Sequence, residues 1–375
     1  MISDRANAKK CIFYLPYQID PIGNGARMVR PQKMIQAFSD IGYDVFVIQG
    51  YSRERKRLIK MVKQNIKNGE KYDFMYTESS TEPTLLTNPN HYPTHPFMDF
   101  RFFHYIKKQG MKIGLFYSDI YWKFEDYGRE LAQLKKYIAI KNYKYDLRQY
   151  EKLLDVFYVP DLGVNEYIDS KYLRQIMSEL PPGADNIAVN EKKSEKRDFA
   201  VDPLKIFYVG GLGGHYEIGK LIQAVSEVNH CQLTVCCRKE EFEKEKENFV
   251  GLLKDNIHIV HKSSKALEAY YENSDICSLA FENSIYMAMA KPFKAYEYLA
   301  YELPVISTKG TAMGTIVEEN NLGFNIEYEV ETIKKVLSTV INSPAILEEY
   351  RKNCATYKKK NLWICRAHKV EEDLV

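Results

Sequence analysis

The stretch LKIFYVGGLGGHY (204–216) decides the fold, because an apolar strand runs there into a loop with four glycines. A helix over roughly 216–229 and a second strand, QLTVCC (232–237), follow directly. Strand, glycine loop, helix and strand in this order are typical of a doubly wound α/β sheet with parallel strands. The alternation continues, with further strands predicted at 257–260, 276–281 and 303–308.

The first half of the chain shows the same alternation. It opens with strand CIFYLPY (11–17), a glycine-containing loop, a helix and strand DVFVIQG (44–50). Further strands are predicted at 72–78, 112–119 and 155–160. Strands that alternate with helices in both halves predict two doubly wound α/β domains.

The predicted domain boundary lies in the polar stretch 181–203, which combines Pro, Gly and many charges as linkers do. We place the boundary near 190–202. The two predicted domains are then 1–195 and 203–349, each a Rossmann-like unit. The C-terminal segment 350–375 is predicted to be helical and able to cross back to the first domain.

Composition and charge narrow the class of protein. The 375 residues are 45% hydrophobic and 27% charged, which suits two globular domains. No signal peptide and no membrane span is apparent, and the seven Cys form no CxxC pair, so we expect buried free thiols and a cytoplasmic protein. Residues 1–200 hold 32 Lys and Arg against 25 Asp and Glu. This modest excess hints at an anionic partner such as a membrane surface, but is too weak to indicate nucleic acid.

A glycine loop follows the first strand of each predicted domain. Gly23 and Gly25 lie in the first loop, where they either let backbone approach a ligand or form a plain tight turn. Gly211, Gly213 and His215 lie in the second, a candidate for contact with the phosphates or sugar of a ligand. The second loop departs from the dinucleotide-binding pattern GxGxxG.

The segment KPFKAYEYL (291–299) carries a second candidate site. A proline suits the first turn of a helix, and the exposed amides around Phe293, with the helix dipole and Lys294, predict an anion site. Glu297 lies one turn further on and is placed to accept hydrogen bonds from vicinal hydroxyls. Lys294 and Glu297 are also three residues apart, so a simple ion pair along the helix is the alternative. The small-residue turn with Gly314 and Thr315 is predicted to lie beside this helix.

The run KPFKAYEYLAYELPVISTKGTAMGTIVEENNLGF (291–324) resembles the C-terminal signature of family 4 glycosyltransferases. That signature is broadly P-x-K-x-x-E-Y-x-A-x-x-x-P-V-I, followed by a glycine turn and an acidic-asparagine-glycine segment. Other stretches agree in order, namely the first glycine loop, LPPGADN (180–186), KIFYVGGLGG (205–214) and ALEAYYENSDICSL (266–279). The resemblance therefore covers nearly the whole chain.

This resemblance implies a GT-B fold, in which two Rossmann-like domains face each other across a cleft. It further implies a nucleotide-diphosphate sugar donor, no metal, no cofactor and retention of the anomeric configuration. By the same resemblance, Glu297 binds the donor ribose, Lys294 and the amides at Phe293 bind the diphosphate, and Gly23 and Gly25 reach the donor's phosphates across the cleft.

The chain departs from the family pattern at two places. Many members have a second glutamate eight positions before the ribose-binding one, and Met289 stands there. Many also have an arginine and a lysine after the first strand of the second domain, where this chain has glycines and His215, with Lys220 further on. Arg238, after the next strand, is our predicted substitute for neutralising the diphosphate.

On the acceptor side, Asp119 closes a predicted strand at its carboxyl end. We expect it to accept or orient the proton of the acceptor hydroxyl, with a helix cap as the alternative. The spacing of His91 and His95 is not expected to hold a metal, because prolines interrupt the loop and a third ligand is not apparent. The basic stretch 53–67 is either a solvated helix face or a contact with an anionic bilayer.

Together these features predict a hexosyltransferase-type enzyme, with a UDP-sugar as the most favoured donor and a hydroxyl of a glycan or lipid-linked glycan as acceptor. Polysaccharide or glycoconjugate assembly is the expected setting, in the cytoplasm or at the inner face of the membrane. Three alternatives stay open. One is a non-catalytic GT-B partner that binds a glycan. The others are a nicotinamide-dependent Rossmann enzyme and a GT-B epimerase or phosphorylase.

Overall fold

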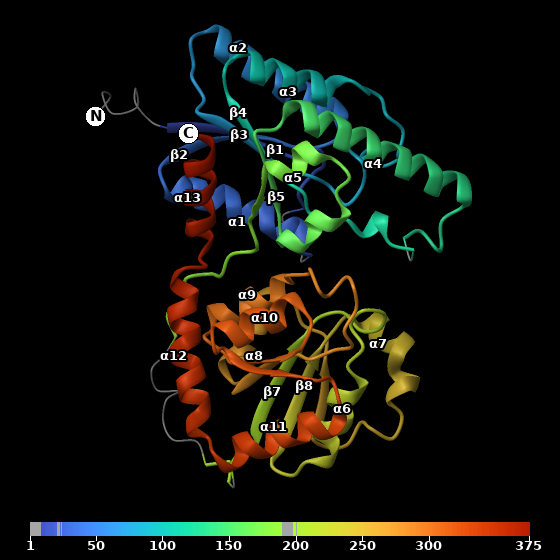
Figure 1. Ribbon diagram of the computed structural model, residues 1–375, viewed down its shortest axis with the longest axis vertical. Coiled ribbons are helices and arrows are strands. Elements are labelled where there is room, and N and C mark those ends of the chain that lie inside the picture. The colour runs from blue at the N-terminus through green and yellow to red at the C-terminus, as the bar shows by residue number, and fades with distance from the viewer. Residues whose placement is uncertain (1–8, 21–22, 24, 126, 190–197, 200) are drawn as a thin grey trace. The chain divides into compact units, whose positions relative to one another are not determined.

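The computed structural model describes residues 9–20, 23, 25–125, 127–189, 198–199 and 201–375. The chain divides into two compact units (Figure 1). Unit 1 comprises residues 1–181 and 363–375, and unit 2 comprises residues 182–362. The predicted linker lies partly outside the described residues, so the predicted boundary stays a prediction. Each unit is described by itself below.

Unit 1 contains a six-stranded parallel sheet in the order β2-β1-β3-β4-β5-β6. Its strands are β1 (Lys9–Tyr14), β2 (Tyr43–Ile48), β3 (Phe74–Glu78), β4 (Lys112–Phe116), β5 (Val156–Val159) and β6 (Met177–Glu179). Its α-helices are α1 (Ala26–Asp40), α2 (Ser52–Lys67), α3 (Met98–Lys108), α4 (Gln133–Leu153), α5 (Lys171–Gln175) and α13 (Trp363–Leu374).

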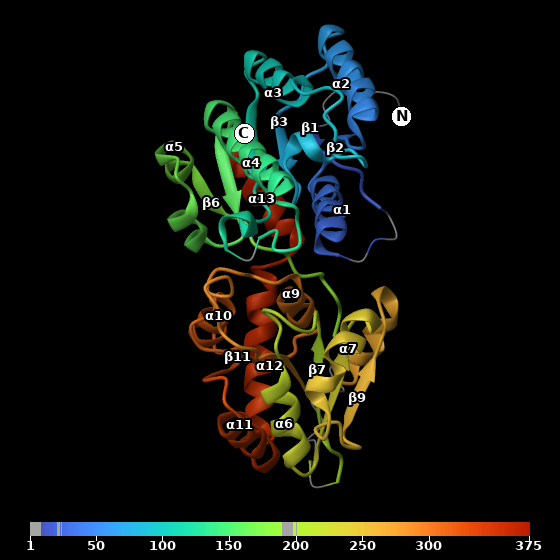
Figure 2. The ribbon, with the colours of Figure 1, turned by 90° about the vertical axis from the view of Figure 1, so that its right-hand side faces the viewer.

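Helices cover both faces of this sheet, which explains why its strands are continuous apolar runs rather than alternating ones. Successive residues of β1 face opposite sides: Phe13 packs on Phe38 of α1, whereas Tyr14 packs on Phe103 of α3. Figures 1 and 2 show α1 and α13 on one side of the strands and α2, α3 and α4 on the other. The C-terminal helix α13 is thus part of the core of unit 1.

Unit 2 contains a second six-stranded parallel sheet, in the order β12-β11-β10-β7-β8-β9. Its strands are β7 (Leu204–Val209), β8 (Cys231–Cys236), β9 (Ile257–Val260), β10 (Ile276–Leu279), β11 (Val305–Thr308) and β12 (Gly323–Ile326). Its α-helices are α6 (Gly219–Glu227), α7 (Lys239–Glu245), α8 (Glu268–Glu272), α9 (Phe293–Ala300), α10 (Ala312–Glu319), α11 (Val330–Asn342) and α12 (Ala345–Lys359).

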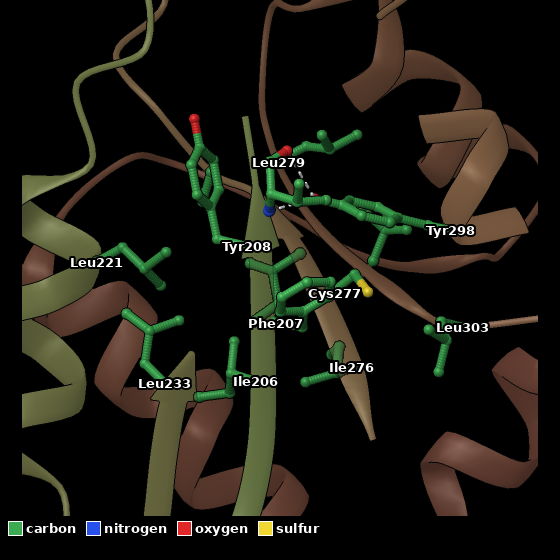
Figure 3. Packing of buried hydrophobic residues seen from close by; sticks show 14 of the residues in the cluster. Ile206, Phe207, Tyr208, Leu221, Leu233, Ile276, Cys277, Leu279, Tyr298 and Leu303 are labelled. Atoms are coloured by element: carbon green, nitrogen blue, oxygen red, sulfur yellow. Dashed lines mark hydrogen bonds between the residues drawn. The ribbon is translucent and has the colours of Figure 1, made fainter. Parts of the chain in front are cut away.

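The core of unit 2 is centred on the two middle strands, β7 and β10 (Figure 3). Phe207 of β7 and Cys277 of β10 pair in register and are completely buried. Tyr298 of α9 is also buried, and its hydroxyl oxygen accepts a hydrogen bond of 3.1 Å from the backbone N–H of Val209. This bond fixes α9 to the carboxyl end of β7.

Candidate functional site

The candidate site lies at the point where the strand order of unit 2 reverses. From β7 the chain proceeds to β8 on one side, and from β10 it proceeds to β11 on the other. Loops that leave two such neighbouring strands diverge, and in doubly wound sheets ligands bind in the crevice that results, beyond the carboxyl ends of the strands. The loop after β7 and the segment between β10 and α9 flank this point. The loop and the helix α9 that follows the segment contain six of the eleven predicted donor-binding residues.

The loop after β7 depends on glycine at one position in particular. Gly213 has a φ of +83°, a conformation that favours glycine, and a β-carbon there would clash with the carboxylate of Glu245. The Tyr208 hydroxyl donates a 2.6 Å hydrogen bond to the carbonyl of Gly211. The N–H of Leu212 donates to the carboxylate of Glu241 at 3.3 Å. The loop is therefore fixed in shape by its neighbours without any ligand.

His215 connects this loop to the segment that follows β10. Its Nδ1 lies 3.3 Å from the Ser284 hydroxyl, and its ring stacks on that of Tyr286 with 5.1 Å between centroids. The sequence analysis identified His215 but not these two partners. Their residue types are common in loops, so no signal in the sequence marked them.

Helix α9 begins at Phe293, directly after Pro292, whose φ of −66° suits a helix start. A helix N-terminus presents unpaired backbone N–H groups and the positive end of the helix dipole. Tyr298 of this helix is bonded to Val209 at the end of β7, the strand from which the glycine loop departs. A helix N-terminus of this kind suits an anion, and anion binding by the amides at Phe293 and Lys294 stays a prediction.

Glu297 lies one turn into α9 and has two partners. The Lys294 ammonium is 2.7 Å from its Oε2, and the Tyr271 hydroxyl donates a 2.8 Å hydrogen bond to the same oxygen. Burial, and after it the negative charge of Glu297, raises the pKa of Tyr271, so this hydroxyl stays a donor. The Glu297 side chain is about a quarter exposed. Tyr271 and Lys294 therefore orient its carboxylate, while part of the side chain remains open to solvent.

Tyr271 is the residue of this site that the sequence analysis missed. It comes from α8, is 3% exposed, and stacks on Tyr301 at 4.7 Å between centroids. A tyrosine 26 residues before Glu297 carries no motif signal, because only the packing of α8 against α9 brings the two together.

Two basic residues considered in the sequence differ in their surroundings. The Arg238 side chain is 75% exposed and pairs with Glu241 at 2.7 Å, the same carboxylate that accepts from the glycine loop. Lys220 of α6 pairs with Glu329 at 3.2 Å and with Glu282 at 3.4 Å. Both lie near loops at the carboxyl edge of the sheet, and the predicted role of Arg238 toward a diphosphate stays a prediction.

Gly314 and Thr315 belong to the first turn of α10. The Thr311 hydroxyl caps this helix by accepting a 2.9 Å hydrogen bond from the N–H of Gly314. Gly314 is buried, and Thr315 is exposed. The turn is joined to the segment after β10 by the Asn283 amide, which donates to the carbonyl of Lys309 at 3.3 Å. It thus lies beside the candidate site, and contact with a donor stays a prediction.

The remaining predicted residues belong to unit 1. Gly25 is the N-cap of α1, and the N–H of Gly23 donates to the carbonyl of Asp20 at 3.0 Å. Asp119 follows β4, and its Oδ1 accepts a 2.7 Å hydrogen bond from the N–H of Tyr121. Burial raises the pKa of Asp119, and the amides of the next residues oppose the shift. The predicted contact of Gly23, Gly25 and Asp119 with the substrates stays a prediction.

Two searches of the described residues gave no candidate. Among them, no group of three or more His, Cys, Asp and Glu is arranged to hold a metal ion. None of the helices that they form is both long and apolar enough to span a bilayer.

Comparisons with known proteins bear on both units. Residues 189–361 match the family model of glycosyl transferases group 1. No curated protein is similar to the chain in sequence at a significant level.

Solved structures are similar in fold over nearly the whole chain. Sucrose-phosphate synthase from Thermosynechococcus elongatus is 14% identical, with a TM-score of 0.62 over 97% of this chain and 98% of its own. The Anabaena protein HepE, in complex with UDP and glucose, is 12% identical, with a TM-score of 0.63 over 96% and 98%. An α,α-trehalose-phosphate synthase (UDP-forming) from Burkholderia xenovorans, in complex with glucose-6-phosphate, is 10% identical, with a TM-score of 0.61 over 98% and 100%.

These likenesses, with the two parallel sheets, confirm the predicted class of fold: two doubly wound Rossmann-like units of the GT-B kind. At such low identity they bear on the fold alone. The group 1 match covers the residues that build the candidate site, from the glycine loop to α12.

Proposed function

We propose that the protein is a glycosyltransferase that takes a sugar from a nucleotide-diphosphate sugar, with a UDP-sugar as donor. One observation carries this proposal. Within the segment that matches group 1, Glu297 is held by Tyr271 and Lys294 one turn into α9, a helix bonded through Tyr298 to the end of β7. An oriented carboxylate, a lysine and a helix N-terminus together complement a ribose and a diphosphate.

Each residue has a part in this proposal. Glu297 accepts hydrogen bonds from the two ribose hydroxyls, while Tyr271 keeps its carboxylate in place. Lys294 moves from Glu297 to the diphosphate, where the positive end of α9 already favours negative charge. The leaving diphosphate gains negative charge as the bond to the sugar breaks, so Lys294 and the positive end of α9 stabilise the transition state more than the ground state.

The finer features of the proposal follow the resemblance to family 4. The acceptor is a hydroxyl of a glycan or a lipid-linked glycan in the assembly of a polysaccharide or glycoconjugate, and transfer retains the anomeric configuration without a metal. Asp119, with its raised pKa at the carboxyl edge of the sheet of unit 1, is the proposed proton acceptor. Gly23 and Gly25 are the proposed contacts from unit 1 to the donor phosphates, as the resemblance implies.

A thermal-shift panel of UDP, GDP, ADP and their sugars tests the donor site. A ligand at 100 times its Kd stabilises the unit that binds it by about 2.7 kcal/mol, which raises the melting temperature of a domain of this size by about 5 °C or more. Glu297→Gln keeps an oxygen for Tyr271 but removes the charge that the ribose hydroxyls need. We expect it to weaken UDP binding by about tenfold or more.

Glu331→Gln is the matched control, because Glu331 of α11 also pairs with a lysine three residues away, Lys334, at 2.9 Å. It removes a similar surface ion pair far along the chain from α9, and UDP should stabilise it as it does the wild type. If GDP or ADP stabilises the protein instead of UDP, the proposed base of the donor is wrong but the proposed site is kept. If no nucleotide stabilises the wild type, the non-catalytic glycan-binding alternative replaces this proposal.

A further inference from the structure

Helix α4 is packed along only part of its length. Its C-terminal half contributes buried residues to unit 1, among them Tyr143, Leu147 and Tyr150. Its N-terminal half extends past the strands of its own unit, as Figure 1 shows. Large apolar side chains are nevertheless exposed on this N-terminal half. They are therefore not needed for the core of unit 1.

Four of these side chains lie within eight residues. Leu131 is 44% exposed, Leu134 70%, Tyr137 59% and Ile138 42%. Leu134, Tyr137 and Ile138 are spaced i, i+3 and i+4, so they share one face of the helix. Single exposed apolar residues are common on proteins, but a contiguous group on a projecting helix marks an interaction surface.

Three lysines lie close to this apolar face in the sequence, and Lys141 shares it, four residues after Tyr137 and three after Ile138. Lys135, Lys136 and Lys141 lie in the same turns, and Lys141 places its ammonium 5.3 Å from the centre of the Tyr137 ring. Within the described part of the chain, no carboxylate forms an ion pair with any of the three. The residues 131–141, which we name the α4 projection, therefore combine an exposed apolar face with three lysines that form no ion pair with the described carboxylates.

We propose that the α4 projection binds the surface of an anionic lipid bilayer. Helices that combine apolar residues with a lysine-rich face lie in the interface, with the apolar side chains among the acyl chains and the lysines at the headgroups. Tyrosine suits the boundary between the two. Each lysine near an anionic leaflet adds about 1 kcal/mol of attraction.

A protein partner fits this surface less well. A stable protein–protein interface takes about 20–30 residues on each side. The α4 projection has eleven residues, of which Ala139 is buried. The positive charge around it also opposes self-association of two copies through this face. A bilayer requires no complementary shape, so a narrow projecting helix is sufficient.

The projection also suits a bilayer better than α2, the basic helix that the sequence marked. The apolar side chains Ile59 and Val62 of α2 are buried in unit 1. Arg55 is 2% exposed and pairs with Asp99. Met61 is the large apolar residue of α2 that is clearly exposed, at 43%. Helix α2 therefore has exposed positive charge but lacks an exposed apolar surface that could insert into a bilayer.

Flotation with vesicles tests the proposal directly. We expect the wild type to float with vesicles of equal parts phosphatidylcholine and phosphatidylglycerol, and not with phosphatidylcholine alone. Leu134→Ser with Ile138→Ser should lower the bound fraction about tenfold or more, because two apolar side chains leave the acyl region. Lys135→Glu with Lys136→Glu should abolish binding to the anionic vesicles.

Changes on α2 are the controls. Met61→Ser is the control for the apolar pair, and Lys56→Glu with Lys60→Glu is the control for the charges. Both variants should bind vesicles as the wild type does. If the α2 charge change lowers binding as much as the α4 change, the proposed location is wrong. If the wild type binds neither kind of vesicle, or if it dimerises in solution and Leu134→Ser with Ile138→Ser makes it monomeric, a bilayer is not the partner.

A spectroscopic variant measures insertion itself. The chain has two tryptophans, Trp122 and Trp363, and each is 6% exposed, so both give a constant background. Tyr137→Trp places a third at the centre of the projection. Its emission should shift to the blue on anionic vesicles and be quenched by brominated acyl chains; absence of quenching would overturn the proposal. No sugar donor is required, so this result is independent of the proposed transferase activity.

Discussion

At the scale of single residues, Asp146 of α4 is a carboxyl group buried with too few partners. It is 4% exposed, its Oδ2 accepts a 2.7 Å hydrogen bond from the N–H of Thr84, and its Oδ1 has no hydrogen-bond partner among the residues that the structure describes. Burial, to which the negative charge of Asp99 adds, raises its pKa to about 7 against the opposing effect of the Thr84 N–H. The folded state therefore holds this proton more tightly than the unfolded chain does.

From this pKa we predict that the free energy of unfolding falls as the pH rises from about 4 to 7. Below about 4 the group is protonated in both states; above 7 the folded protein must bury a charge. Asp146→Asn resembles the protonated form, so we expect it to be more stable than the wild type at pH 8 by about 2 kcal/mol or more. Urea denaturation at pH 5 and pH 8 measures the difference, which should shrink at pH 5. An equal difference at both pH values would contradict the buried charge.

At the scale of elements, the start of α10 shows how a glycine can be required inside a helix. Gly314 is buried, and a β-carbon there would approach the Thr308 carbonyl and the Asn325 side-chain oxygen too closely. Alanine has the better helix propensity by about 1 kcal/mol, but overpacking a site costs about 1–3 kcal/mol. We therefore predict that Gly314→Ala lowers the free energy of unfolding by about 1 kcal/mol or more.

Gly219 in the first turn of α6 is the matched control for this prediction. A β-carbon there would meet mainly the mobile end of the Glu217 side chain. Gly219→Ala should therefore be neutral or stabilising in the same urea denaturation. If the two alanine variants change stability alike, the backbone contact of Gly314 is not what decides the effect.

The elements also show how far the sequence alone can lead. Strand β10 was predicted from Ile276 onward, because all of its residues are buried and buried parallel strands are apolar runs that stand out. The edge strands β6 and β12 were missed, since three residues of each are only half-buried and neither strand contains such a run. The same limit applies to the site. The anion site predicted at the start of α9 rests on local sequence, whereas the hydrogen bond from Tyr271 to Glu297 depends on how α8 packs.

At the scale of the whole molecule, the chain crosses between units twice, because α13 returns to unit 1. Leu374 of α13 is 1% exposed and packs at Gly114 of β4. Tyr43 and Tyr158 of the sheet donate hydrogen bonds of 3.0 Å to Glu371 and Asp373 of the same helix. The last thirteen residues thus stabilise the first unit, although unit 2 separates the two in sequence.

This arrangement predicts that two matched leucine changes act on different unfolding transitions. Leu374→Ala removes core volume from unit 1 and Leu337→Ala from unit 2, where Leu337 is completely buried. Each should cost about 2–5 kcal/mol. Both tryptophans belong to unit 1, so tryptophan fluorescence follows that unit alone, whereas circular dichroism follows both.

We expect Leu374→Ala to lower the melting temperature seen by fluorescence, and Leu337→Ala to lower a transition that circular dichroism detects and fluorescence does not. UDP should raise the melting temperature only of the transition that circular dichroism alone detects, because the proposed site lies in unit 2 and a ligand stabilises the unit that binds it. Coincident transitions in both variants would instead mean that the units unfold as one. In that case α13 would couple the stability of the donor site to the core of unit 1, and UDP would raise both signals together.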